Sequence, residues 1–255
     1  MPSSTASSAE PPPGVRALAA GDWAGQVAGA FAGLLGRRPS LRMCLATGRT
    51  PLPVYAALAA RPLSWGRASV LLLDEFGELP PGEPGGCDAT LRRALVDRVG
   101  LRPGGYRPID TAAADLEAEC RAVDAWLDQG LGLAVLGLGG NGHLGMNEPG
   151  AGAGSRTRRV ELAPATVAAS ARYFAGRRRP GWGVTVGLAD LLAAERVWVL
   201  VTGAAKAAMV AACLEEPPGP DRPASLLQGH PGCTWWLDEA AASRLTGRAG
   251  AAQTT

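Results

Sequence analysis

Short apolar runs alternate along the chain with longer stretches rich in Ala and Leu. The runs have the length and composition of buried parallel strands, and the longer stretches suit helices. Strands are expected at residues 41–46, 69–73, 133–138, 184–186, 197–201 and 234–237. Helices are expected at residues 15–35, 51–60, 89–99, 113–128 and 204–215. This rhythm of βαβ units predicts an α/β fold with an open, mostly parallel, Rossmann-like sheet and helices on both faces.

The two ends of the chain lack this pattern. Residues 1–14 are rich in Ser, Ala and Pro without a periodic apolar face, and residues 247–255 have no apolar pattern either, so both are expected to be disordered tails. A chain of 255 residues with 47% hydrophobic content can bury one large core. The sequence therefore predicts a single domain over residues 15–246.

Composition narrows the class of protein. The 25 basic and 23 acidic residues leave a formal charge of +2, which favours neither a nucleic-acid groove nor a membrane-binding surface. The five cysteines are widely spaced and odd in number, which disfavours a disulfide framework or a zinc ribbon and fits a reducing cytosol. No apolar run reaches membrane-spanning length, and residues 1–14 do not resemble a signal peptide. We therefore expect a cytoplasmic protein whose partners are small molecules.

The first expected strand is followed by Thr47-Gly48-Arg49-Thr50-Pro51. In open α/β sheets, ligands bind outside the carboxyl ends of the strands. If Thr50 caps a helix whose first position is Pro51, the free backbone N–H groups of that helix face a ligand and can hold an anion. The alternative is a plain tight turn with a good helix cap. Arg49 favours the anion, so this loop is a candidate phosphate cradle.

Charged side chains follow two further strands. Asp74 and Glu75 come directly after an apolar run, and alternation along a strand lets only one of them face a pocket. An acid at such a position is a candidate general base, with simple surface solvation as the alternative. Lys206 is expected in the first turn of a helix, where a cation is disfavoured unless it meets an anion such as phosphate; the alternative is an exposed lysine.

The segment after the third expected strand is rich in glycine. Gly137, Gly139 and Gly142 can be aligned with the G-x-G-x-x-G dinucleotide-binding motif. That motif requires a long helix after its third glycine, but Gly145 and Pro149 interrupt any helix here. The segment instead offers a flexible backbone that can approach a ligand closely.

His143 lies among these glycines, and Glu148 follows nearby. Histidine suits proton transfer near neutral pH, and this setting favours a functional role over a structural one. A zinc site is not expected, because the chain has no H-E-x-x-H or comparable ligand spacing. Arg172 stands apart from the arginine run at residues 177–179, which is expected to be solvated, and can reach a pocket from a mobile segment.

Taken in order, these motifs resemble the glucosamine-6-phosphate deaminase (isomerase) family, which shares a fold with 6-phosphogluconolactonases. The resemblance covers roughly residues 41–245. Its motifs are at residues 46–51, 73–75, 137–150, 155–158, 226–231 and 238–239. The sequence Asn147-Glu148-Pro149-Gly150 is similar to the deaminase branch in particular, because lactonases typically lack it.

The resemblance implies roles for individual residues. Asp74 would move a proton between C2 and C1 of the opened sugar, and His143 would assist ring opening with support from Glu148. No metal or organic cofactor is implied, and homo-oligomers are common in the family. The expected catalytic residues are Asp74, His143, Glu148 and Asn141. The expected substrate and phosphate ligands are Thr47, Gly48, Arg49, Thr50, Gly139, Gly142, Arg172 and Lys206.

The chain departs from the family pattern at three places. Asn141 stands where the family usually has an aspartate, and it can accept a hydrogen bond but carries no charge to stabilise an imidazolium. Arg49 replaces a small residue, and Cys87-Asp88 takes the place of a Ser-Tyr pair.

The first functional hypothesis is isomerisation of an amino-sugar 6-phosphate with release of ammonia, or the reverse amination. The second is hydrolysis of a sugar-phosphate lactone, which the Asn-Glu-Pro sequence disfavours. The third is a sugar-phosphate sensor without catalysis, which predicts a helix-turn-helix module that the short, Pro-rich N-terminal tail does not hold.

Overall fold

A parallel seven-stranded sheet forms the centre of the protein, whose computed structural model describes residues 14–171, 173–176 and 178–246. The strand order is β1-β10-β9-β6-β2-β3-β5, and every neighbouring pair is parallel. The strands are β1 (Gly14–Leu18), β2 (Arg42–Leu45), β3 (Ser69–Leu72), β5 (Tyr106–Arg107), β6 (Leu133–Gly137), β9 (Val197–Val201) and β10 (Cys233–Asp238).

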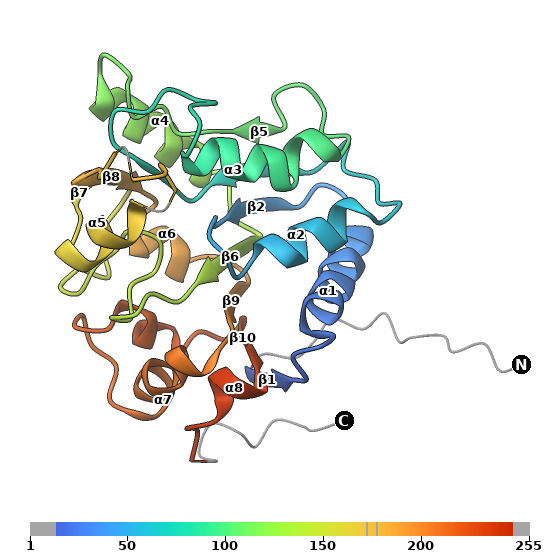
Figure 1. Cartoon of the computed structure of the whole chain (residues 1–255). Coiled ribbons are helices and arrows are strands. Elements are labelled where there is room, and N and C mark those ends of the chain that lie inside the picture. Colours follow the sequence, from blue (N-terminus) through green and yellow to red (C-terminus); the bar gives the residue numbers. More distant parts are fainter. Residues whose placement is uncertain (1–13, 172, 177, 247–255) are drawn as a thin grey trace, which may run out of the picture.

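Helices connect these strands and pack on the sheet. Among them, α1 and α2 lie together on one side of the sheet and α6 lies on the other (Figure 1). The α-helices are α1 (Trp23–Arg37), α2 (Leu52–Ala59), α3 (Cys87–Ala94), α4 (Leu116–Leu127), α5 (Pro164–Ser170), α6 (Leu188–Leu192), α7 (Ala207–Glu215) and α8 (Glu239–Ala242). Short 3-10 helices are η1 (Val96–Arg98), η2 (Ala204–Lys206) and η3 (Pro223–Leu227). The expected α/β class with a mostly parallel central sheet is confirmed.

A second, antiparallel sheet is built from β4 (Asp74–Phe76), β8 (Trp182–Thr185) and β7 (Arg158–Glu161), in the order β4-β8-β7. The expectation that residues 184–186 form a strand of the parallel sheet is wrong, because β8 pairs with β4 instead. An apolar run reports burial but does not specify its partner strand. Since β4 follows β3 after Leu73 alone, Asp74 lies where the two sheets meet.

The start of the chain also differs from the sequence-based expectation. The helix expected at residues 15–35 begins only at Trp23, and Gly14, which the sequence pattern places in a tail, opens β1. This edge strand pairs with β10, and the Arg16 guanidinium lies 5.5 Å from the ring centre of Trp236. Long-range pairing thus overrides a local pattern that carries little strand signal. The other residues of the two expected tails, 1–13 and 247–255, lie outside the described part of the chain.

The cysteines and the helices concern two further expectations. All five cysteines are free thiols, and four of them are buried. In the described ranges, no helix combines the length and the apolar character needed to cross a bilayer.

Candidate active site

A cleft of about 860 Å³ lies at the carboxyl ends of β2, β3, β6 and β9. This is where ligands bind in open parallel sheets. Nine of the residues expected from the sequence line it: Thr47, Gly48, Arg49, Thr50, Asp74, Gly139, Asn141, His143 and Lys206. Residues far apart in the chain therefore converge on one cavity.

The loop after β2 carries no side-chain helix cap among the residues described. The expectation that Thr50 caps a helix starting at Pro51 is wrong, because Pro51 itself is the N-cap and α2 begins at Leu52. Gly48 has a φ of 134°, a conformation that side chains strongly disfavour. The first N–H groups of α2 are therefore not used by a cap, which leaves them able to bind an anion, and the exposed Arg49 lies beside them at the cleft.

Asp74 and Glu75 point in different directions from β4. The Asp74 side chain lines the cleft, whereas the buried Glu75 carboxylate turns toward the start of α3. Glu75 accepts backbone hydrogen bonds of 2.8 Å from Phe76, Cys87 and Asp88. One acid is thus available to substrate, and its neighbour joins β4 to α3.

Burial makes Asp74 a stronger base than an ordinary aspartate. Desolvation raises the pKa of Asp74 to about 6, although a hydrogen bond from the Cys87 thiol and the charge of His143 act in the opposite direction. Cys87 also lines the cleft, and its thiol interacts with Thr47. At neutral pH, Asp74 is therefore ionised and still able to take up a proton.

His143 is supported by a cluster of polar side chains. Its Nδ1 lies 3.4 Å from Glu148 Oε2, and the same oxygen accepts a 2.8 Å hydrogen bond from Asn141 Nδ2. Thr166 donates a 2.5 Å hydrogen bond to the other oxygen of Glu148. Burial raises the pKa of Glu148, but the nearby His143 imidazole and the hydrogen bonds from Thr166 and Asn141 outweigh it and lower that pKa to about 2. Glu148 is therefore a fixed negative charge behind the imidazole.

Two glycines permit the close packing around these groups. A Cβ atom on Gly139 would lie 2.3 Å from the His143 ring, so the imidazole rests directly on the backbone. Gly145 has a φ of 60°, and a Cβ there would lie 2.9 Å from Thr185 Oγ1 and 3.2 Å from an oxygen of Asp74. The positions of His143 and Asp74 therefore depend on glycine at residues 139 and 145, where a side chain would collide with them.

The other three expected site residues and the helix position of Lys206 have different outcomes. Glu148 is not among the residues lining the cleft, and it lies behind His143, which does line it. Lys206 ends η2 and is the N-cap of α7, so it lies directly before the first turn of that helix and not within it, and it lines the cleft. Gly142 is buried outside the cleft lining, where a Cβ would meet Arg222 and Met209. Arg172 lies outside the described residues.

The sequence gives no signal for one part of the site. The short helix α5 supplies Thr166 and Ser170 to the cleft, and Tyr173 follows it. Thr166 lies in an Ala-rich stretch without a recognisable motif, so its contact with Glu148 emerges only in the folded chain.

Comparison with known proteins relates this chain to sugar-phosphate enzymes. Residues 16–236 match the family described as glucosamine-6-phosphate isomerases/6-phosphogluconolactonase. The chain is 42% identical to a glucosamine-6-phosphate deaminase of Pseudarthrobacter chlorophenolicus over 83% of this chain and 84% of that protein. It is 41% identical to a glucosamine-6-phosphate deaminase of Streptomyces coelicolor over 86% of this chain and 87% of that protein.

Solved structures agree with these matches. A monomeric glucosamine-6-phosphate deaminase is similar with a TM-score of 0.87 at 31% identity, covering 91% of this chain and 99% of that one. The 6-phosphogluconolactonase of Thermotoga maritima has a TM-score of 0.71 at 21% identity, covering 88% and 98% respectively, and this likeness extends to the fold alone.

Proposed function

The chain belongs to the family of glucosamine-6-phosphate isomerases and 6-phosphogluconolactonases, and on this basis we propose that it is a glucosamine-6-phosphate deaminase. It converts glucosamine 6-phosphate and water into fructose 6-phosphate and ammonia, or runs the reverse amination on a related sugar phosphate. The observation that carries the proposal is that Asp74 and His143 face one cleft in a chain about 40% identical to curated deaminases.

The two acid–base groups divide the reaction. His143 moves the proton between the ring oxygen and the C1 hydroxyl, which opens the sugar ring. Asp74 takes the proton from C2 and returns it to C1 while a proton passes from the amine nitrogen to O1, which converts the open-chain amino aldose into the imine of a ketose. Water then hydrolyses this imine and ammonia leaves. A pKa of Asp74 near 6 suits a group that must both accept and return a proton near neutral pH.

Glu148 and Asn141 orient the imidazole in this mechanism. The Glu148 carboxylate lies on the Nδ1 side of His143, so Nε2 is directed to the sugar. Asn141 Oδ1 also accepts a 3.3 Å hydrogen bond from the backbone N–H of His143. The Asn141 amide therefore contacts both the backbone of His143 and the carboxylate beside its ring. Asn141 lacks the charge of the aspartate that the family usually has here, and it acts instead through these two hydrogen bonds.

The phosphate group is held at some distance from the reacting carbons. Thr47, Gly48, Arg49 and Thr50 lie on one side of the cleft and Lys206 comes from another element. Gly139 offers bare backbone at the cleft floor, and Arg172 is assigned to the phosphate from the family resemblance. Binding energy from this remote group positions C1 and C2 against the acid–base residues.

Hydrolysis of a sugar-phosphate lactone is the second candidate that the family contains. Its support is the likeness of fold to lactonases at identities of 21% and below. The Asn147-Glu148-Pro149 sequence and the contact of Glu148 with His143 favour deamination.

The finer sequence-based expectations stay predictions. These are a cytoplasmic location, homo-oligomers, no nucleic-acid or membrane partner, and turnover without a metal or organic cofactor. Size-exclusion chromatography checks the assembly state, and activity after dialysis against a chelator checks the metal.

The proposed function is tested by incubating the protein with glucosamine 6-phosphate and measuring ammonia and ketose phosphate. Asp74→Asn and His143→Ala are expected to abolish both products. His230→Ala is the matched control, because His230 lies outside the cleft lining, where it contacts Ala194 O and Gly232 N. Absence of turnover by the unaltered protein, or activity that survives the first two substitutions, contradicts the proposal. A parallel assay with a 6-phosphogluconolactone identifies the lactonase alternative.

A further inference from the structure

The buried side chain of Asn147 connects the loop that carries His143 (residues 138–147) to residues of the second sheet and directly after it. It is fully shielded from solvent. Its Nδ2 donates hydrogen bonds to Leu144 O at 3.0 Å and to Val186 O at 2.9 Å. Its Oδ1 accepts a 2.9 Å hydrogen bond from Arg158 Nη1. Both amide protons and the amide oxygen are therefore used, as a buried amide requires.

Of the two carbonyls that Asn147 joins, one belongs to the segment that carries His143 and the other to the segment that pairs with the strand carrying Asp74. Leu144 directly follows His143. Val186 donates its backbone N–H to Leu73 O at 2.9 Å, one residue before Asp74, and Thr185 is the partner of Asp74 in the β4–β8 pair. The Asn147 amide thus joins Leu144, which follows His143, to Val186, which follows the strand partner of Asp74.

Other contacts keep these segments at a fixed and short separation. The backbone N–H of Met146 donates a 3.2 Å hydrogen bond to Thr185 Oγ1. Gly145 approaches Asp74 and Thr185 so closely that a Cβ atom would be crowded by both. A shift of the loop along β8 would therefore change the position of His143 relative to Asp74.

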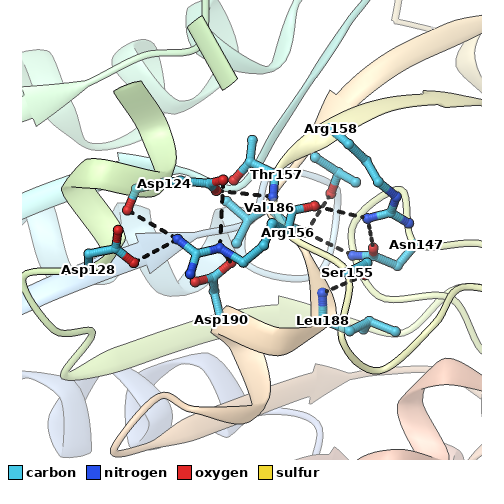
Figure 2. A network of polar contacts seen from close by, with 11 residues as sticks. Asp124, Asp128, Asn147, Ser155, Arg156, Thr157, Arg158, Val186, Leu188 and Asp190 are labelled. Atoms are coloured by element: carbon cyan, nitrogen blue, oxygen red, sulfur yellow. Dashed lines mark hydrogen bonds and ion pairs between the residues drawn. The ribbon is translucent and has the colours of Figure 1, made fainter. Parts of the chain in front are cut away.

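Arg158 fixes the orientation of the Asn147 amide. A guanidinium group can only donate hydrogen bonds, so Oδ1 must face Arg158 and Nδ2 must face the two carbonyls. The Arg158 guanidinium also donates to Arg156 O at 3.3 Å. Figure 2 shows Arg158 and Asn147 beside each other at one end of the polar network.

Arg156 anchors the other end of this network. Its guanidinium forms ion pairs with Asp124 at 3.6 Å, Asp128 at 2.7 Å and Asp190 at 3.3 Å (Figure 2). These carboxylates come from α4, the residue after it, and α6. The segment that carries Arg158 is therefore attached to helices that pack on the main sheet.

We propose that Asn147 is a positioning residue that sets the distance between His143 and Asp74, with its amide held in register by Arg158. The proposal rests on the deaminase function proposed above. Asn147 is not among the residues lining the cleft, so it acts through backbone that it holds. Misplacing reacting groups by about 1 Å can cost roughly 100-fold in rate.

Asn147→Asp tests this role. It keeps the shape of the side chain and the oxygen that accepts from Arg158, but it replaces the Nδ2 donor by an oxygen that faces the carbonyls of Leu144 and Val186. We expect kcat per folded molecule to fall roughly 10- to 100-fold, with a smaller change in KM. Gln228→Glu is the control for the same change of an amide to a carboxylate, made at an exposed side chain. Gln228 Nε2 also bridges two carbonyls, those of Cys213 at 2.9 Å and Glu216 at 2.6 Å, outside the cleft lining. This control is expected to retain kcat per folded molecule.

A second readout does not depend on activity. The ring signals of His143 in an NMR spectrum are expected to move in Asn147→Asp, while those of His230 stay in place as an internal reference. Arg158→Met removes the group that orients the Asn147 amide. It is expected to cause a smaller fall in kcat and a smaller shift of the His143 signals. It also serves as the test variant if Asn147→Asp does not fold. Normal kcat and unmoved His143 signals in folded Asn147→Asp, or in Arg158→Met if the first variant does not fold, would overturn the proposal. If the unaltered protein lacks deaminase activity, the proposed function fails, and the NMR signals still decide whether Asn147 positions His143.

Discussion

Thr166 donates a 2.5 Å hydrogen bond to Glu148 Oε1, on the side of the carboxylate opposite His143. Thr166 comes from α5, which follows β7 of the second sheet. A residue from the segment beside the cleft is therefore bonded to the acid that supports the imidazole. Because hydrogen bonds to an ionised carboxylate are stronger than those between neutral groups, this contact joins α5 to the acid–base site.

Thr166→Val is expected to lower kcat about tenfold, because it removes one charge-assisted hydrogen bond, worth roughly 1.5 kcal/mol, from Glu148. Thr166→Ser keeps the hydroxyl and is expected to restore most of the activity. Steady-state kinetics with glucosamine 6-phosphate measure both variants. Equal activities of the Val and Ser variants would show that the hydrogen bond has no catalytic role.

The acid side of the pH profile is expected to follow Asp74. Since its pKa is raised to about 6 and the base must be ionised, kcat/KM should fall as pH decreases through about 6. Cys87→Ala removes a hydrogen bond that lowers the pKa of Asp74, so the fall should begin at higher pH. The control is Cys213→Ala, which removes a buried thiol in α7 away from the cleft lining. Identical pH profiles for the two cysteine variants would argue against the Cys87–Asp74 contact.

The buried Glu75 is expected to make stability depend on pH. Burial raises the pKa of Glu75 to about 7 from an ordinary 4.5, despite three backbone hydrogen bonds and with a small contribution from Asp74. Its protonated form therefore contributes stability that is complete below about pH 4.5 and is lost as pH rises through about 7. Glu75→Gln stays neutral throughout this range.

The measurement is urea unfolding of the unaltered protein and Glu75→Gln between pH 4.5 and 8. The free energy of unfolding of the unaltered protein should fall relative to the variant by on the order of 3 kcal/mol as pH rises. Asp74 is present in both proteins, so most of its own titration cancels in the difference. Parallel stability curves would show that Glu75 is not the group responsible.

Gly139→Ala is expected to reduce activity at least 100-fold, because the added Cβ would occupy the position of the His143 ring and displace the imidazole. The matched control is Gly152→Ala, where a Cβ meets no described atom within 4 Å. Circular dichroism establishes that both variants are folded before their kinetics are compared. A Gly139→Ala enzyme with normal kcat would mean that the imidazole position is not required for turnover.

The sequence by itself determined the fold class and most of the candidate cleft. Periodicity is local, so apolar runs such as residues 197–201 identify buried strands before any partner is known. In a parallel sheet the carboxyl ends of the strands share one edge, so Asp74, His143 and Lys206 could be expected to meet there. Alternation along a strand also predicted that Asp74 and Glu75 would face different ways.

Tertiary structure decided what depends on contacts between distant segments. β1 and β8 took strand partners that their local patterns do not encode, and Pro51 displaced Thr50 as the N-cap of α2. Gly142 lies outside the cleft lining although it shares a motif with Gly139. The hydrogen bonds of Thr166 and Asn147 follow the same rule. Each joins groups whose distance is set by how the two sheets and their helices pack, and no spacing along the chain specifies that distance.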